Sequence, residues 1–202
     1  MSCRSLNRRY RQIRSRGDIK MPDEPLLALR QATAPLHQQL DQHRVLKPLM
    51  SASLSPAQYA VALASLLRPQ QVLEEALQQA LTQYYPEYRY ALRYPWLQQD
   101  LQELGQPCPE ASDLNFSIHG ETQGIGVLGL LYVLEGSRLG AQVMLKNLRR
   151  CALPCAFFAS ALNSETEGWS GFLQLLRHTP QQDFSAAVET AVDAFHLLLK
   201  RM

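Results

Sequence analysis

The chain has 202 residues, of which 46% are hydrophobic and 19% are charged, and its formal net charge at pH 7 is +2. These values are typical of one globular domain with a single apolar core, and they exclude an intrinsically disordered or disulfide-rich chain. The longest nearly apolar run, residues 125–134, is far shorter than the ~20 residues of a membrane span, so we expect no membrane-spanning helix.

The charge is unevenly distributed along the chain. Residues 1–20 contain seven basic residues and one acidic residue, whereas the rest contains 13 basic and 17 acidic residues. A basic arm can bind nucleic acid or an acidic surface, and arginine-rich segments also occur in organelle transit peptides. We expect instead that residues 1–22 form a disordered extension, or a translated leader upstream of a true start at Met21, and that residues 23–202 form one domain. No apolar core follows the basic residues, so no secretory signal is predicted.

The cysteines do not form a disulfide framework. The four positions are scattered, and two of them lie four residues apart, which is not the spacing of a zinc site. They are Cys3, Cys108, Cys151 and Cys155. A cytoplasmic location is the resulting expectation.

Helical periodicity continues through the body of the chain. The spacing of apolar residues predicts helices over residues 26–40, 57–81, 121–150, 157–162, 169–176 and 184–199. Ser55-Pro56 is a typical helix start, whereas Pro35 and Pro69 each predict a kink or an interruption. Glu74 and Glu75 lie in a run typical of a surface. No segment alternates β-branched residues as a strand would, so the predicted fold class is all-α.

Two glycines lie four residues apart in the most apolar of these helices. Each glycine inside a helix costs about 1 kcal/mol relative to alanine. Gly136 and Gly140 share one face and leave the backbone bare, so either a neighbouring helix or a flat ligand comes close to it. Helix packing alone does not explain why polar Ser137 and Gln142 lie beside them.

One histidine of the chain, His37, is a candidate metal ligand. His37 follows the apolar positions of the first helix, and it is either an axial ligand for porphyrin iron or a boundary residue of the core. His43 lies six residues later, about 240° around the helix if the helix continues that far, and in that case the two cannot share one site. The sequence has neither a His-Glu-x-x-His motif nor a Glu-x-x-His motif, which argues against a zinc hydrolase and a di-iron carboxylate site.

Two segments together resemble the heme oxygenases, in particular their bacterial biliverdin-producing branch. Residues 29–37 (LRQATAPLH) are similar to the proximal helix of that family, and residues 132–142 (YVLEGSRLGAQ) are similar to its distal helix. The resemblance covers about residues 25–200. It implies a single-domain helical fold in which heme lies between a proximal and a distal helix.

The resemblance also implies the catalytic groups of the site. His37 would be the axial ligand of the heme iron. Gly136 and Gly140 would let the distal backbone lie on the heme and leave room for O2, and Ser137 would lie in the distal pocket. All four residues match the family motifs by position.

Further positions are implied with less specific motifs. Arg30 and Tyr132 would each contact a heme propionate, and Arg177 is a third candidate for this role. Arg138 is large for its position and is expected to point to solvent. Ala141 replaces the second glycine of the Gly-Gly pair of the family.

The implied reaction is the O2-dependent cleavage of heme to biliverdin, CO and Fe2+. Heme would be both substrate and cofactor, and electrons would come from an external reductase or ferredoxin, because no flavin or nicotinamide motif occurs in the chain. The implied partners are heme, O2, an electron-donor protein and, where biliverdin serves as a chromophore, a phytochrome. Neither nucleic acid nor a membrane is expected as a partner.

Two other functions stay open at this point. The first is a non-catalytic heme carrier or sensor on the same fold. The second is a helical interaction module without heme, in which the glycines serve only to pack helices.

Overall fold

The computed structural model describes residues 24–109, 114–120, 124–179 and 184–201, and within these residues it contains helices and no β-strand. This confirms the predicted all-α fold. The basic extension predicted over residues 1–22 lies outside the described residues. None of the described helices is apolar over a stretch long enough to cross a membrane.

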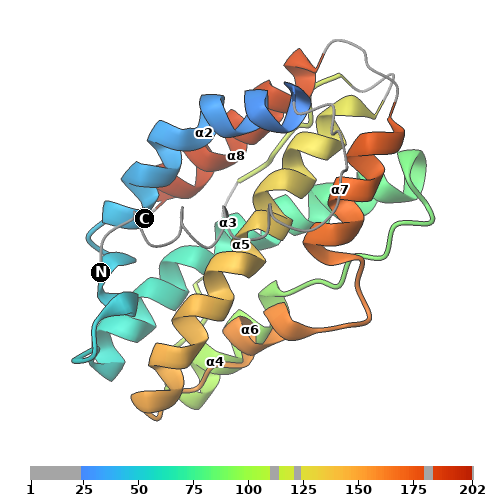
Figure 1. The fold of residues 1–202 in the computed structure, drawn as a ribbon. Helices are drawn as coiled ribbons and strands as arrows, with labels where there is room; N and C mark the ends of the chain where they lie inside the picture. Colours follow the sequence, from blue (N-terminus) through green and yellow to red (C-terminus); the bar gives the residue numbers. More distant parts are fainter. Residues whose placement is uncertain (1–23, 110–113, 121–123, 180–183, 202) are drawn as a thin grey trace, which may run out of the picture.

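Seven α-helices and two 3-10 turns make up the described part of the chain (Figure 1). They are α2 (Glu24–Gln42), η2 (Lys47–Met50), α3 (Pro56–Tyr84), α4 (Tyr94–Glu103), α5 (Ile125–Arg150), α6 (Ala156–Ala159), η3 (Ser160–Leu162), α7 (Gly168–His178) and α8 (Ser185–Arg201). Each helix predicted from periodicity is present within a few residues of its expected bounds. Helix α4 was not predicted, because the sequence shows only an aromatic segment there.

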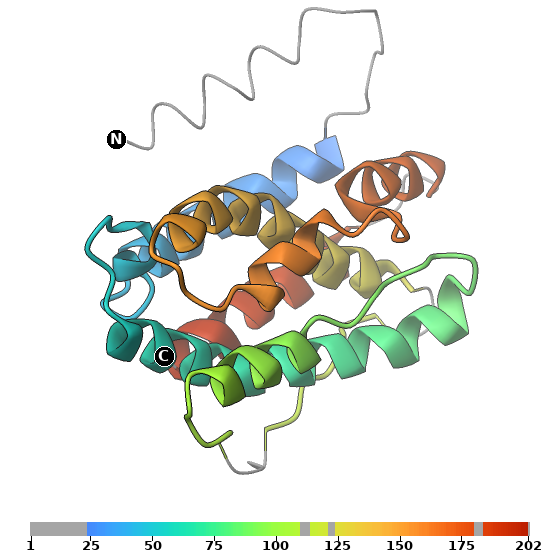
Figure 2. The same ribbon diagram turned by 90° about the horizontal axis from the view of Figure 1, so that it is seen from below.

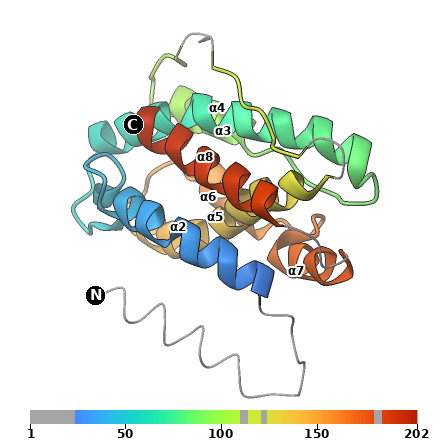
Figure 3. The ribbon, with the colours of Figure 1, turned by 90° about the horizontal axis from the view of Figure 1, so that it is seen from above.

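Helix α8 supports the rest of the fold. It packs against α2, α3 and α5, and Figure 3 shows it between α2 and α3. Helix α4 lies alongside α3, as seen in Figure 2, and α7 packs against α5. The two helices that carry the sequence motifs, α2 and α5, are therefore both held against α8.

Close packing explains two glycines in the first half of α5. A Cβ atom on Gly129 would overlap the backbone carbonyl of Ala187 in α8. A Cβ atom on Gly126 would overlap the backbone carbonyl of His119. These two glycines are therefore required by neighbouring backbone.

Prolines do not end the helices that contain them. Pro35 lies inside α2 and Pro69 inside α3, and both helices continue past them, so the predicted interruptions are absent. Helix α3 begins with a capping box, in which the Ser55 hydroxyl accepts from Gln58 N–H and the Gln58 side chain accepts from Ser55 N–H. The buried apolar face of α3 compensates for the hydrogen bond lost at Pro69.

Glu74 is fully buried in α3, so the expectation of a surface position was wrong. Its Oε1 accepts hydrogen bonds from the Gln70 side chain and the Tyr90 hydroxyl, each at 2.8 Å. Its Oε2 accepts from the backbone N–H groups of Arg93 and Tyr94, each also at 2.8 Å. One carboxylate thus fixes the segment that leads into α4.

We expect Glu74→Ala to lower the free energy of unfolding by about 3 kcal/mol, because three buried donors and one partly buried donor lose a charged acceptor. Its neighbour Glu75 is exposed and provides a matched control. Glu75→Ala should change the stability by less than about 0.5 kcal/mol. Urea unfolding followed by circular dichroism measures both, and equal losses in the two variants would contradict this role of Glu74.

Candidate functional site

Helices α2 and α5 run in the same general direction (Figure 1). A side-chain hydrogen bond joins them. The Thr33 hydroxyl donates to the Leu29 carbonyl at 2.7 Å, so it accepts from the Tyr132 hydroxyl, 3.1 Å away. His37 follows Thr33 by about one helical turn, and Gly136 follows Tyr132 by about one turn. The structure therefore brings the two sequence motifs together, one turn beyond a shared contact.

Gly136 and Gly140 face open space. A Cβ atom on Gly140 would meet nothing within 4 Å, and one on Gly136 would lie 3.6 Å from Cζ3 of Trp169, which is an ordinary contact. Unlike Gly126 and Gly129, neither is required by a neighbouring helix in the described part of the chain. Packing therefore does not account for the helix stability that these two glycines cost.

His37 is the exposed imidazole on α2. Its side chain is 61% exposed, and its Nδ1 lies 3.1 Å from Oδ2 of Asp41, one turn later on the same helix. The Phe195 ring of α8 lies beside it, with ring centroids 6.0 Å apart. The hydrogen bond to Asp41 raises the pKa of His37, although burial acts in the opposite direction. A histidine held by a carboxylate through one nitrogen presents the other nitrogen to a metal.

The predicted propionate contacts come from three helices. Arg30 lies exposed on α2, about two turns before His37, and Arg177 lies exposed near the end of α7. Tyr132 is partly buried, and its hydroxyl bonds to Thr33. The roles of these three residues at a propionate stay predictions.

Trp169 is a site residue to which sequence reasoning gave no role. It is the second residue of α7, which begins at Gly168 with a φ of +60°. Its ring centroid lies 5.9 Å from that of Tyr132 and 5.0 Å from that of Phe172. This aromatic cluster forms a wall beside Gly136.

The opposite face of α5 carries a buried ion pair. Arg138 is only 3% exposed, so the expectation that it points to solvent was wrong. Its Nε lies 3.1 Å from Oε2 of Glu135, and its terminal nitrogens donate to the carbonyls of Ser160 and Ala91, each at 3.2 Å. Burial raises the pKa of the Glu135 carboxyl, and the charge of Arg138 opposes this effect. Charged side chains thus anchor the back of α5 while its front is bare.

Ser137 is linked to a second buried arginine. Its side chain is exposed, but its Oγ accepts a hydrogen bond at 3.0 Å from Nη1 of Arg93, which is 1% exposed. Sequence reasoning missed Arg93, because an arginine between aromatic residues before a helix carries no motif. Only the folded arrangement places its guanidinium behind Ser137.

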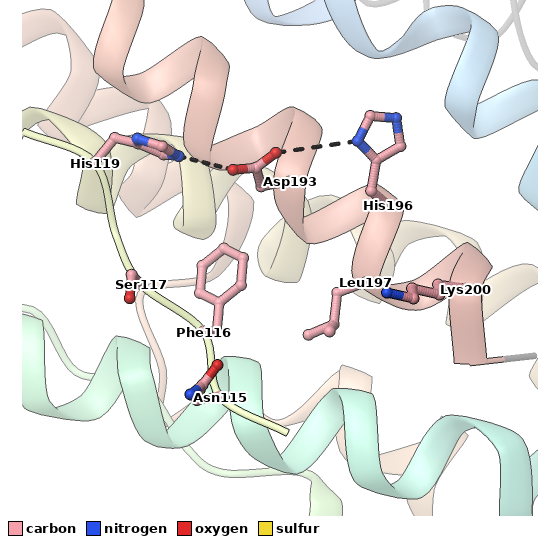
Figure 4. A pocket seen from close by; sticks show the side chains of 8 residues that line it. All are labelled: Asn115, Phe116, Ser117, His119, Asp193, His196, Leu197 and Lys200. Carbon is pink, nitrogen blue, oxygen red and sulfur yellow. Dashed lines mark hydrogen bonds and ion pairs between the residues drawn. The ribbon is translucent and has the colours of Figure 1, made fainter. Parts of the chain in front are cut away.

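A pocket of about 330 Å³ lies elsewhere, between the segment 115–119 and α8 (Figure 4). In it, Asp193 Oδ2 lies 2.7 Å from Nε2 of His119, and Asp193 Oδ1 lies 4.0 Å from Nδ1 of His196. None of the predicted site residues lines it. Among the described residues, no group of three or more histidine, cysteine or acidic side chains could hold a metal ion.

Open space at Gly140 gives a direct stability prediction for the unliganded protein. Gly140→Ala should raise the free energy of unfolding by about 0.5–1 kcal/mol, because alanine favours the helix and meets no neighbour. The matched substitution Gly129→Ala should destabilise the protein by about 2 kcal/mol or more, because it forces α5 away from α8. Equal changes in the free energy of unfolding for Gly140→Ala and Gly129→Ala, measured in urea, would contradict the conclusion that only Gly129 is required by packing.

The contact between His37 and Asp41 gives a pH dependence. Its stabilisation is fully present below pH about 6.5, the ordinary pKa of histidine, and is lost as the pH rises through the raised pKa of His37. Because both groups are exposed, Asp41→Asn should cost less than about 1 kcal/mol, and only at the lower pH. An NMR titration of His37 should show a lower pKa in Asp41→Asn, and no such change in the control Glu103→Gln. An unchanged His37 pKa in Asp41→Asn would contradict the contact.

Comparisons with known proteins identify the family of the chain. The family model for heme oxygenase matches residues 26–202. A heme oxygenase of Xanthomonas campestris pv. campestris is 31% identical over 121 residues, which cover 55% of this chain and 70% of that protein. The crystal structure of heme oxygenase-1 from the cyanobacterium Synechocystis sp. PCC6803, in complex with heme, has a TM-score of 0.62 and 18% identity, covering 88% of this chain and 90% of that one. The structural match shows a shared fold, and the family match shows that the chain belongs to the heme oxygenase family.

Proposed function

We propose that this protein binds heme between α2 and α5 and cleaves it, with O2 and externally supplied electrons, to biliverdin, CO and Fe2+. Membership of the heme oxygenase family supports heme degradation as the general activity. The observation that carries the finer proposal is the bare backbone at Gly136 and Gly140, about one and two turns beyond the contact that joins α5 to the helix of His37.

The residues present fit a bound heme. A helix face without side chains lets a flat macrocycle lie against its backbone, and Gly136 and Gly140 provide such a face. His37 offers an imidazole nitrogen that Asp41 does not occupy. Arg30, exposed on the same helix, supplies a cation suited to a carboxylate. The chemistry of the protein groups therefore matches an iron porphyrin with charged propionates.

These groups also suit oxidation of the ring. When bound, heme supplies the iron at which O2 is reduced. An imidazole ligand such as His37 gives less electronic push toward O–O cleavage than a thiolate gives. Ser137 and the bare backbone present no strong acid to the open space. A distal wall of this kind directs a bound molecule toward one edge of the ring by shape.

The electrons would come from a separate reductase or ferredoxin, since the chain has no flavin or nicotinamide motif. We infer a cytoplasmic location, which fits the free thiols of Cys108, Cys151 and Cys155. The product would pass to a biliverdin-accepting phytochrome, or the released iron would serve nutrition.

The proposal is tested by adding hemin, then ascorbate or a ferredoxin with its reductase. We expect a Soret band on binding and then its loss, with the absorption of biliverdin appearing and CO released. A Soret band that persists without biliverdin would instead identify a carrier or sensor. If hemin does not bind, the chain is an interaction module.

Replacing His37 tests the axial ligand separately. We expect His37→Ala to change the Soret spectrum of the hemin complex and to weaken hemin binding roughly tenfold or more, a loss of about 1.4 kcal/mol. His43 lies just beyond the end of α2 and serves as the control. His43→Ala should leave both the spectrum and the affinity unchanged. An unaltered spectrum in His37→Ala would show that another group binds the iron.

A further inference from the structure

We propose that Arg93 is a positioning residue for Ser137, and that Ser137 acts in the site as a hydrogen-bond acceptor and not as a proton donor. This inference rests on the proposed function, because it concerns the open space beside Gly136. It assigns a role to a buried cation that lies outside both sequence motifs.

Arg93 is held rigidly behind α5. Besides its bond to Ser137, its Nε donates to the Ser160 hydroxyl at 3.2 Å and its Nη2 donates to the Phe157 carbonyl at 3.3 Å. The guanidinium carbon lies 4.3 Å from the centroid of the Phe157 ring. The backbone N–H of Arg93 is bound by Glu74. Because the Arg93 guanidinium is held at this many points, its Nη1 has little freedom to move. The position of Ser137 Oγ, which binds Nη1, is therefore fixed as well.

The hydrogen of the Ser137 hydroxyl already takes part in a hydrogen bond within the protein. Ser137 Oγ donates to the Leu134 carbonyl at 2.7 Å and accepts from Arg93 Nη1 at 3.0 Å. A hydroxyl has one hydrogen and two lone pairs, so one lone pair is left. Ser137 can therefore accept one further hydrogen bond and cannot donate one without breaking its bond to Leu134.

The remaining lone pair belongs to an exposed side chain next to the proposed site. Ser137 lies about 100° around the helix from Gly136, at the edge of the bare face, and its side chain is exposed. A water molecule that donates one hydrogen to Ser137 keeps its second hydrogen for a neighbour in the open space. Ser137 would thus orient a water as a donor, with its own hydroxyl acting only as acceptor.

Arg93 also contributes charge. Burial lowers the pKa of its guanidinium, while the nearby Glu74 and Glu135 carboxylates favour the charged form. An arginine stays protonated even so. The Nη1 arm is the part of this buried network that reaches toward the open side of α5. Through Ser137 it favours negative charge in that space.

The test uses the full chain loaded with ferric hemin, and it measures the pH midpoint of the acid-to-alkaline change in the visible spectrum. Ser137→Ala removes the acceptor with little effect on packing. Arg93→Lys keeps a positive charge but lacks the guanidinium nitrogen that donates to Ser137. Ser160→Ala removes a different hydrogen bond of Arg93 and is the matched control. Ser137→Thr keeps the hydroxyl. Urea unfolding of each unliganded variant establishes that it is folded.

We expect Ser137→Ala and Arg93→Lys each to raise the midpoint by about 0.5 unit or more, because both release the water whose second hydrogen favours a negatively charged group in the open space. Arg93→Lys should cause no further shift in the Ser137→Ala background, since it acts through that hydroxyl. Ser160→Ala and Ser137→Thr should keep the midpoint of the unsubstituted protein.

An unshifted midpoint in Ser137→Ala overturns the proposal even where Arg93→Lys does not fold. It is also overturned by additive shifts, or by an equal shift in Ser160→Ala. The failure of the proposed function would look different. In that case the unsubstituted chain would not bind hemin, or would bind it without producing biliverdin.

Discussion

The position of α5 is the constraint on which the rest of the site depends. This helix must expose backbone on one face without losing its place in the fold, and the exposed face provides no side chains to hold it. The opposite face supplies the missing contacts, because Glu135 and Arg138 are buried there as an ion pair and Arg138 donates to the carbonyls of Ser160 and Ala91. Buried charges with partners on neighbouring segments fix a helix in one register, which a uniformly apolar face does less strictly.

Glycine has two distinct physical roles along this single helix. Gly126 and Gly129 allow backbone to approach backbone, and this contact attaches α5 to its neighbours. Gly136 and Gly140 approach no backbone of a neighbouring element in the described part of the chain. They lower the stability of the helix, and no packing contact offsets this cost. The first pair therefore serves the fold, and the proposed heme site accounts for the second pair. Proteins commonly accept local instability of this kind at functional sites.

Much of the architecture could be predicted from the sequence. Apolar periodicity reports which face of a helix is buried, and short motifs placed His37 and Gly136 on the right helices. Periodicity treats every charged residue as exposed, however, and so Glu74 and Arg138 were assigned to the surface. Their burial depends on partners far along the chain, such as Tyr90 for Glu74. Arg93 was missed for the same reason, since its partners Ser137 and Phe157 lie on other elements.

The central claim is that the open space beside Gly140 is where heme lies. The most direct measurement compares hemin affinity with stability in Gly140→Leu, whose side chain would fill that space. We expect the free energy of unfolding of the unliganded variant to stay within about 1 kcal/mol of that of the unsubstituted protein, because no described neighbour is displaced. We expect hemin affinity to fall by roughly tenfold or more. An unchanged affinity in a stable Gly140→Leu variant would contradict the claim.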